Sequence, residues 1–318
     1  MAQLISIIVT VLNEEKTIST LLESVFGQTY PVHEVLISDG GSTDNTQTII
    51  KEFQKKHPHF HVRLLKAPGN RSIGRNTAIA TSTSNMLAIT DAGCEPHRDW
   101  LTELVNVYEQ FKLSPESKSD KGVVIAGYYD AKPKTAFEEA VIPYVLVMPD
   151  HVNPDTFLPA TRSMLLEKKV WTTLSGFNEK LRWNEDYDFA QRLVKSHIPI
   201  VFAEKALVTW FPRENLGQFC KMIFHFAQGD AQAGIWRKKV LFIFVRYFLG
   251  FVLLILLLRN FHIALAVYFF LLGSSFYSIW AMAKNQKYVK KGLIWLPILQ
   301  ISSDLAVMAG SLAGIISS

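Results

Sequence analysis

The stretch that decides the fold is LISIIVTVLNEE, residues 4–15. Its first nine residues are mostly apolar and rich in β-branched side chains, and its last three are polar. The apolar run is short and follows no basic region, so it does not have the features of a signal peptide. A run of this kind, bounded by a polar turn, is typical of a buried strand in a parallel sheet. We therefore expect residues 4–12 to form the first strand of an α/β domain.

Strand-like and helix-like segments alternate after this first strand. Helical spacing of apolar residues occurs at 16–28, 44–56 and 71–82, and short apolar runs occur at 35–38, 62–65 and 86–90. The resulting order of strands and helices predicts an open, mainly parallel sheet covered by helices. In such sheets ligands bind beyond the carboxyl ends of the strands. The site should therefore lie where polar residues follow the strands.

The pattern becomes less regular in the middle of the chain. We expect a strand at 123–129 and irregular structure over the site at 130–160, a segment that contains five prolines. We further expect helices at 164–174 and 185–196 and a short strand at 200–203.

Three apolar stretches come last, at residues 240–258, 261–283 and 292–316. Each is long enough to cross a hydrocarbon core of about 30 Å as a helix. The basic run at 237–239 and the four lysines of 284–291 would lie on the same side of the membrane. The excess of positive charge on cytoplasmic loops then places residues 1–236 in the cytoplasm. This placement of cations accounts for the net charge of +5 without nucleic acid as a partner.

The third apolar stretch is the most polar of the three, because it carries Pro297, Gln300 and Asp304. It can span the membrane, or it can form a re-entrant or interfacial helix. Asp304 can be a functional acid inside the membrane or can lie at a cavity, and the sequence favours neither reading. Gly310 and Gly314 have the spacing at which small residues let helices pack closely.

Polar clusters follow three of the expected strands, and a fourth begins an expected helix. They are Asn13-Glu14, Asp39 to Ser42, Asp91 to Cys94, and Glu185-Asp186. Each has an ordinary structural reading as a turn or a helix cap. The functional reading is that carboxylates beside a diphosphate can hold a divalent cation, and that a carboxylate can act as a general base. Arg71 and Arg75 lie one helical turn apart, so they can meet phosphates or form a solvated helix face.

The clusters occur in an order that carries more information than any one of them. The series VTVLNEE, ISDGGSTDNT, NRSIGRNTAI, ITDAGC and LSGFNEKLRWNEDYDFAQRL resembles the family-2 inverting glycosyltransferases of the GT-A fold, over residues 4–205. The resemblance implies a GT-A, Rossmann-like, mainly parallel α/β domain followed by C-terminal transmembrane helices. We expect a catalytic domain at 1–212, an interfacial amphipathic segment at 213–239, and a membrane domain with three transmembrane helices at 240–318.

The resemblance also implies roles for single residues. The implied nucleotide-sugar site comprises Val11, Asn13, Glu14, Asp39, Ser42, Arg71, Arg75 and Asp91. Asp186 would be the base with Glu185 supporting it, and Asp91 would bind Mn²⁺ or Mg²⁺. One departure concerns the metal, since Gly93 stands where the family has the last acid of its Asp-x-Asp motif. Asp91 is then the one sure protein ligand, Glu95 can help, and catalysis without a metal stays open.

The implied function is the transfer of a sugar, with inversion, from a nucleotide-diphosphate donor to a lipid-linked or membrane-presented acceptor. It would take place on the cytoplasmic face of an inner or cytoplasmic membrane. Two alternatives stay open. One is a polyprenyl-phosphate monosaccharide synthase, and the other is a nucleotide-binding membrane scaffold without transferase activity.

Overall fold

The computed structural model describes residues 3–118, 120–260 and 263–317. The chain divides into two compact units, and each is described by itself. The first unit comprises Met1–Lys132 and Met148–Phe211, and the second comprises Pro133–Val147 and Pro212–Ser318. The first unit contains a sheet covered by helices, and the regular structure described in the second unit is helical.

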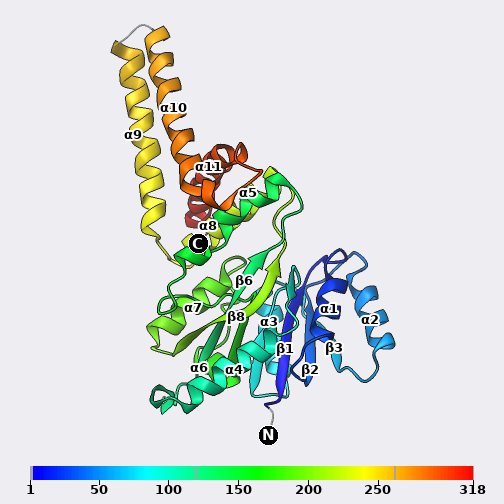
Figure 1. Ribbon diagram of the computed structural model, residues 1–318. Helices are drawn as coiled ribbons and strands as arrows, with labels where there is room; N and C mark the ends of the chain where they lie inside the picture. The colour runs from blue at the N-terminus through cyan, green and yellow to red at the C-terminus, as the bar shows by residue number, and fades with distance from the viewer. Residues whose placement is uncertain (1–2, 119, 261–262, 318) are drawn as a thin grey trace. The chain divides into compact units, whose positions relative to one another are not determined.

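The first unit is built on a sheet with the strand order β3-β2-β1-β4-β7-β6-β8-β5 (Figure 1). The strands are β1 Ile5–Val11, β2 Glu34–Asp39, β3 Val62–Lys66, β4 Met86–Ile89, β5 Cys94–Pro96, β6 Val124–Ala131, β7 Met164–Glu167 and β8 Ile200–Trp210. β3, β2, β1 and β4 are parallel neighbours, as are β6 and β8, whereas β7 and β5 run against their neighbours. The expected α/β domain with a mainly parallel sheet is confirmed.

The helices of the first unit pack on this sheet. They are α1 Ile18–Phe26, α2 Thr46–Lys56, α3 Arg71–Thr81, α4 Trp100–Leu113, α6 Lys168–Thr173 and α7 Glu185–Lys195, with 3-10 turns at Pro115–Lys118 and Pro149–His151. Buried residues of the central strands, such as Ile8 and Leu166, share one apolar core with Ile79 of α3 and Phe189 of α7. Phe177 stacks on Phe189 with ring centroids 4.4 Å apart. This common core fixes α3 and α7, which carry most of the site described below.

The expectation of irregular structure over residues 130–160 is wrong in part. This segment contains the helix α5, Ala136–Val145, which belongs to the second unit. Thr135 caps α5, because its hydroxyl accepts a hydrogen bond from the amide of Glu138 at 3.1 Å. Pro143 lies inside the helix two residues before its end, and it removes one amide donor from the hydrogen-bond ladder. Proline density alone was therefore a poor guide to this segment.

The expected helix at 164–174 is also wrong in its first part. Met164–Glu167 is the strand β7, and the helix α6 begins only at Lys168. A four-residue apolar run fits a strand or a buried helix equally well, and its pairing with β4 and β6 decides the matter. The last strand is likewise longer than expected, because it continues past residue 203 to Trp210.

The second unit contains three helices that are long and apolar enough to cross a membrane, among the residues described. The helices of this unit are α5, α8 Leu216–Gln232, α9 Lys238–Asn260, α10 Ile263–Asn285 and α11 Trp295–Ile316, with a 3-10 turn at Gln286–Tyr288. α9 and α10 lie side by side as a long pair (Figure 1). Two residues of the second expected stretch, 261 and 262, lie outside the described residues.

The helix α11 differs from the other two apolar helices because it is partly covered. Within the unit, a third of its most apolar window is buried, against none for α9 and 6% for α10. Its main neighbour is α8, and Gly310 and Gly314 lie at their contact. A Cβ atom at Gly314 would lie 2.6 Å from Ala231 Cβ and from the Gln228 carbonyl, and one at Gly310 would meet the Phe224 carbonyl. The two small residues therefore pack helices, as their spacing predicts, and their partner is α8.

Candidate active site

Arg75 stands at the centre of the candidate site, in the middle of α3, with its side chain 1% exposed. Its Nη1 donates to Glu185 Oε1 at 2.5 Å. Its Nη2 donates to Asp91 Oδ1 at 2.9 Å and to Thr161 Oγ1 at 3.0 Å. The guanidinium also lies over the Phe177 ring, with Cζ 5.5 Å from the centroid. One buried cation thus joins α3, the loop after β4, the segment that leads into β7 and the start of α7.

The charges of this cluster stabilise one another. Burial by itself would lower the pKa of Arg75, but Glu185 and Asp91 raise it above its ordinary value. Burial would raise the pKa of Asp91, but the positive charges of Arg75, Arg71 and Arg162 lower it below its ordinary value. Arg75 and Asp91 are therefore ionised at neutral pH.

Asp186 follows Glu185 in the first turn of α7 and is half-buried. Burial and the neighbouring Glu185 raise the pKa of Asp186, although Arg75 opposes this effect. A carboxylate with a raised pKa is a better proton acceptor than an ordinary one. The Tyr187 amide donates to Asp186 Oδ1 at 2.9 Å. Asp186 thus has the electrostatic environment of a general base.

The start of α7 is shaped by a residue in an unusual conformation. Asn184 adopts the left-handed conformation, with φ of 59°, directly before the helix begins at Glu185. Asparagine tolerates this conformation better than most residues do. The first turn of α7 then carries Glu185, Asp186 and Asp188, which complement the positive end of the helix dipole. For Glu185, this local effect adds to the ion pair with Arg75.

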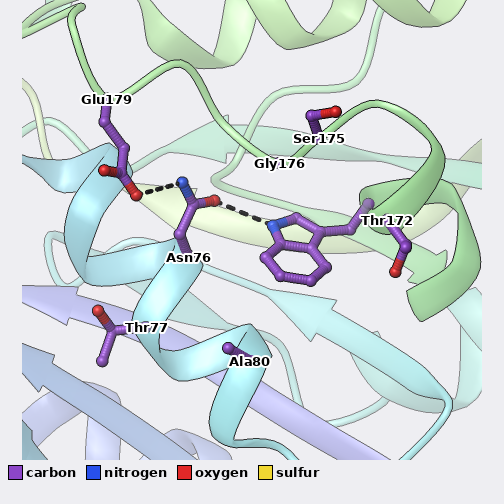
Figure 2. Close-up of a pocket in the computed structure, with 8 residues that line it drawn as sticks. Asn76, Thr77, Ala80, Thr172, Ser175, Gly176 and Glu179 are labelled. Carbon is purple, nitrogen blue, oxygen red and sulfur yellow. Dashed lines mark hydrogen bonds between the residues drawn. The ribbon is translucent and has the colours of Figure 1, made fainter.

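Asn76, one position after the buried arginine, holds the turn that leads to α7. Its Oδ1 accepts from Trp171 Nε1 and from the Phe177 amide, both at 2.9 Å. Its Nδ2 donates to the Phe177 carbonyl at 2.8 Å and to Glu179 Oε1 at 2.9 Å. Figure 2 shows the contact between Asn76 and Glu179. Gly176 has φ of 75°, and a Cβ there would lie 2.7 Å from Asn76 Oδ1, so a glycine is needed.

The pocket in Figure 2 lies between α3 and α6 and has a volume of about 510 Å³. Asn76 and Trp171 line it, whereas Asp91 and Asp186 do not. Among its lining residues, Asn76 accepts from Trp171 and donates to Glu179. We therefore assign this pocket a structural role, separate from the acidic cluster.

The loops after β1 and β2 form a second group of expected site residues. Asp39, which is 3% exposed, accepts from Ser42 Oγ at 2.5 Å, from the Ser42 amide at 3.0 Å, and from Gln47 Nε2 at 2.6 Å. Asn13 has φ of 57°, its amide donates to Ser42 Oγ at 2.9 Å, and its Oδ1 accepts from the Thr43 amide at 2.9 Å. The two loops are thus bound to each other, and Asp39 serves as their anchor.

Val11 and Glu14 belong to the same group. Val11 pairs with Asp39 in the sheet, and its carbonyl accepts from the Gly40 amide at 2.9 Å. The Glu14 amide donates to Thr46 Oγ1 at 2.8 Å. The expected turn residues therefore converge at the carboxyl ends of two adjacent strands, which is where ligands bind in sheets of this kind.

The two arginines of α3 have different environments. Arg71, in the first turn, is exposed, with Cζ 5.8 Å from the centroid of the Trp183 ring. Arg75 is enclosed by the acids. The two arginines that were expected near the phosphates therefore differ. Arg71 has an exposed guanidinium, whereas the guanidinium of Arg75 is bound to Asp91 and Glu185 and positions them.

Thr161 and Arg162 belong to the site but were missed from the sequence. Thr161 accepts from Arg75, and Arg162 Cζ lies 5.4 Å from the Tyr129 ring and 5.7 Å from the Trp210 ring. Arg162 also contributes to lowering the pKa of Asp91. A threonine and an arginine before an apolar run match no sequence motif. They reach the site because β7, which follows them, pairs with β4 and β6.

The donor set for a metal ion is small. Asp91 contacts Arg75 through Oδ1, and Gly93 offers no side-chain ligand. In the described part of the chain, no three His, Cys, Asp or Glu side chains lie together so as to hold a metal ion. Divalent cations such as Mg²⁺ take about six oxygen ligands. The residues present therefore do not fit a metal centre built by the protein alone.

The chain is similar to known glycosyltransferases over the segments described above. The family model described as glycosyl transferase family 2 matches residues 6–126. Glycosyltransferase AglE of Haloferax volcanii is 24% identical over 239 residues, which is 73% of this chain and 74% of that protein.

A second relative comes from Methanococcus voltae. It is named dolichyl N-acetyl-alpha-D-glucosaminyl phosphate 3-beta-D-2,3-diacetamido-2,3-dideoxy-beta-D-glucuronosyltransferase. It is 34% identical over 124 residues, and the match covers 38% of this chain and 39% of that protein. The similarity to this relative is thus confined to part of each chain.

Solved structures share the fold at low sequence identity. The mannosyltransferase PcManGT from Pyrobaculum calidifontis, in complex with GDP-Man and Mn²⁺, has a TM-score of 0.55 and 16% identity, over 98% of this chain and 74% of that one. S. aureus TarS 1–349, in complex with UDP-GlcNAc, has a TM-score of 0.52 and 17% identity, over 71% of this chain and 66% of that one. The sheet and its helices therefore have the GT-A architecture.

Proposed function

The chain belongs to glycosyltransferase family 2, and on that premise we propose that it moves a sugar from a nucleotide-diphosphate donor to a lipid-linked or membrane-presented acceptor. The observation that carries the proposal is the Arg75 cluster, which brings Asp91 and Glu185 onto one guanidinium with Asp186 beside them. It unites a strand-end acid and a helix-start acid pair that lie almost a hundred positions apart in the sequence. The donors GDP-Man and UDP-GlcNAc of the two solved structures support a nucleotide sugar as substrate.

The donor would lie at the carboxyl ends of β1, β2 and β4. The loop residues Val11, Asn13, Glu14, Asp39 and Ser42 would hold the base and ribose. Arg71 is the outward cation of α3, and it would meet the charge of the diphosphate. Arg75 would act through Asp91 and Glu185, because its guanidinium is bound to them.

The reaction would be a direct displacement at the anomeric carbon. The acceptor oxygen forms the new bond to this carbon, and the bond from the carbon to the donor phosphate breaks. The electron pair of that bond leaves with the diphosphate, and the proton of the acceptor hydroxyl passes to Asp186. The raised pKa of Asp186 suits it to this transfer.

The matched experiment compares Asp186→Asn with Asp188→Asn in the purified full chain. We expect Asp186→Asn to lower kcat about 10²–10⁴-fold with donor binding retained. Asp188 lies in the same helical turn but forms an ion pair with Arg192 at 2.8 Å, so its variant should retain most activity. Equal losses in both variants would contradict the assignment of the base.

The same variants separate the alternatives. A phosphate acceptor is already ionised and needs less from a base, so near-normal transfer by Asp186→Asn would favour a polyprenyl-phosphate monosaccharide synthase. Donor binding by the unaltered chain, without transfer to a broad set of acceptors, would favour a membrane scaffold.

We also propose that α9, α10 and α11 anchor the chain as three spans, with the first unit on the cytoplasmic side. Their length and hydropathy support this, as does the position of Lys238 and Lys239 at one end of α9. The name of the Methanococcus relative, which contains a dolichyl phosphate, supports a lipid-linked acceptor. Protease digestion of sealed vesicles of known orientation tests the arrangement, since the first unit should be cut only when the cytoplasmic face is outside.

A further inference from the structure

A polar network lies within the apolar helices of the second unit. Asp304, in the middle of α11, is 1% exposed. Its Oδ2 accepts from Arg246 Nη2 of α9 at 2.6 Å, from the Tyr247 hydroxyl at 3.3 Å, and from the Tyr277 hydroxyl of α10. Its Oδ1 accepts from Gln300 Nε2 at 3.1 Å. One acid therefore joins three helices and is fully satisfied.

A second cation lies beside this network. Lys284, at the end of α10, donates from Nζ to Gln300 Oε1 at 3.2 Å, which is an amide oxygen and not a carboxylate. Its Nζ also lies 5.5 Å from the centroid of the Trp280 ring and 5.7 Å from that of Tyr144. Arg246, Lys284 and Asp304 together carry a net charge of +1, and Asp304 pairs with Arg246.

Only part of the Arg246 guanidinium takes part in the network. Its side chain is 39% exposed, although one nitrogen is bound to Asp304. Its Nε is buried and has no hydrogen-bond partner among the described residues. Its guanidinium lies over the rings of Tyr277, at 4.8 Å, and Trp280, at 5.7 Å. Trp280 and Lys284 are both exposed. A further acceptor can therefore reach this cationic and aromatic face.

The network lies toward one end of the three helices. Arg246 is eight residues, or about 12 Å, from the start of α9, and Asp304 is about 13 Å from the start of α11. Lys284 is next to the last residue of α10. All three ends adjoin the basic segments of the chain. Long cations and tryptophans at this depth reach the level of lipid headgroups.

An alternative is that the network serves only to hold the helices together. Asp304 with Arg246, two tyrosine hydroxyls and an amide would be enough for that purpose. Lys284 takes no part in that arrangement, since its side chain is exposed and contacts the Gln300 amide oxygen instead of an acid. The exposed part of the Arg246 side chain adds a second cation to the same face. Both observations favour an anionic ligand.

We propose that Arg246 and Lys284 bind the phosphate monoester of a membrane lipid, with Asp304 as the residue that positions Arg246. If this phosphate is itself the acceptor, the reaction is that of the polyprenyl-phosphate synthase named above, and this identification, unlike the lipid site, rests on the proposed function. Trp280 would lie against the first part of the lipid chain.

The test measures lipid binding and not transfer. The purified full chain in phosphatidylcholine vesicles is labelled with a photoreactive polyprenyl-phosphate analogue. Polyprenyl phosphate, phosphatidic acid, uncharged polyprenol and phosphatidylglycerol are each added as competitors. We expect labelled peptides from 238–247 and 277–291, with competition by one or both of the phosphate monoesters. Which of the two competes identifies the source of the phosphate. Equal competition by polyprenol or by phosphatidylglycerol would overturn the proposal.

Variants complete the test. Lys284→Gln, which keeps a group for Gln300, should reduce labelling about tenfold, and Arg246→Lys should reduce it less. Lys290→Gln removes a charge from the exposed adjoining segment and should leave labelling unchanged. Equal labelling of the Lys284→Gln and unaltered chains would overturn the proposal. Since Arg246→Gln can disturb Asp304, the double variant Arg246→Gln/Asp304→Asn serves as its folding control.

Donor binding is measured on the same samples. Loss of lipid labelling with donor binding intact in Lys284→Gln is the expected result. Absence of donor binding in the unaltered chain, with lipid labelling intact, would count against the proposed function and leave the lipid site standing.

Discussion

The two units solve the problem of a buried charge in opposite ways. In the first unit a buried cation, Arg75, is surrounded by the acids Asp91 and Glu185. In the second a buried acid, Asp304, is surrounded by one cation and neutral donors. The side chain of Arg75 is 1% exposed, whereas that of Arg246 is 39% exposed. The first centre therefore depends on each charged partner, and the second can keep its acid satisfied when a partner is lost.

The largest effect should come from removing the buried cation. Arg75→Leu leaves Glu185 buried without its partner and should lower the free energy of unfolding by about 3–5 kcal/mol. Arg246→Leu leaves Asp304 with three neutral donors, and should cost about 1–2 kcal/mol. Hydrogen exchange of the α3 and α7 peptides measures the first effect, and that of α11 peptides measures the second. Arg71→Leu, on the exposed face of the same helix, is the control and should change stability by less than about 0.5 kcal/mol. Equal losses for Arg75 and Arg246 would refute the comparison.

The next effect concerns what else holds α11 in place. Gly310→Ala puts a Cβ against the Phe224 carbonyl of α8 and should destabilise the unit by about 1–3 kcal/mol. Gly273→Ala in α10 has open space around it and is the matched control. Thermal unfolding in detergent, followed by circular dichroism, measures both. If the two variants melt alike, the Asp304 network and not the contact with α8 fixes α11.

A smaller effect concerns Asp186 and Asp91, which should make the stability of the first unit depend on pH in opposite ways. Folding raises the pKa of Asp186 above its ordinary value of 3.8, so its ionised form destabilises the folded state. This cost is absent well below pH 3.8, grows as pH rises, and is complete above the raised pKa. Asp186→Asn should therefore raise the Tm of the unit at pH 7, and raise it less in acid.

Asp91 should behave in the opposite way. Folding lowers its pKa, so its ionised form stabilises the folded state above pH 3.8, and this stabilisation is lost as pH falls through the lowered pKa. Asp91→Asn should consequently destabilise the unit at pH 7. A gain in Tm for Asp91→Asn, or a loss for Asp186→Asn, would show that their environments are not as described.

The smallest effect on stability is expected from Gly93→Asp. Apart from its two chain neighbours, no described residue has an atom within 4 Å of a Cβ at this position, so the change should cost less than about 0.5 kcal/mol. It adds the acid that the family motif has and this chain lacks. If a divalent cation acts beside Asp91, the variant should need several-fold less Mn²⁺ for half-maximal activity. An unchanged Mn²⁺ response would show that no metal acts at this loop.

Much of the site was predictable because strand ends are strong local signals. The loops after β1, β2 and β4 lie where the apolar runs of the sequence end. The assignment of Glu185 and Asp186 to the start of a helix was confirmed for the same reason. Thr161 and Arg162 could not be found in this way. They precede the strand β7, and no local sequence pattern predicts that β7 pairs with β4 in the antiparallel direction. The separate roles of Arg71 and Arg75 were equally hidden, because spacing does not reveal which side of α3 is covered.

The sequence by itself determined the alternation of strands and helices, the three long apolar helices and the order of the acidic motifs. These depend on periodicity and length, which are local properties of the chain. Only the tertiary structure decided that Arg75 is a buried partner of Asp91 and Glu185, that Asn76 holds the turn before α7, and that Asp304 is satisfied by three helices. Each depends on side chains far apart in sequence, whose burial makes hydrogen bonding obligatory once the chain has folded.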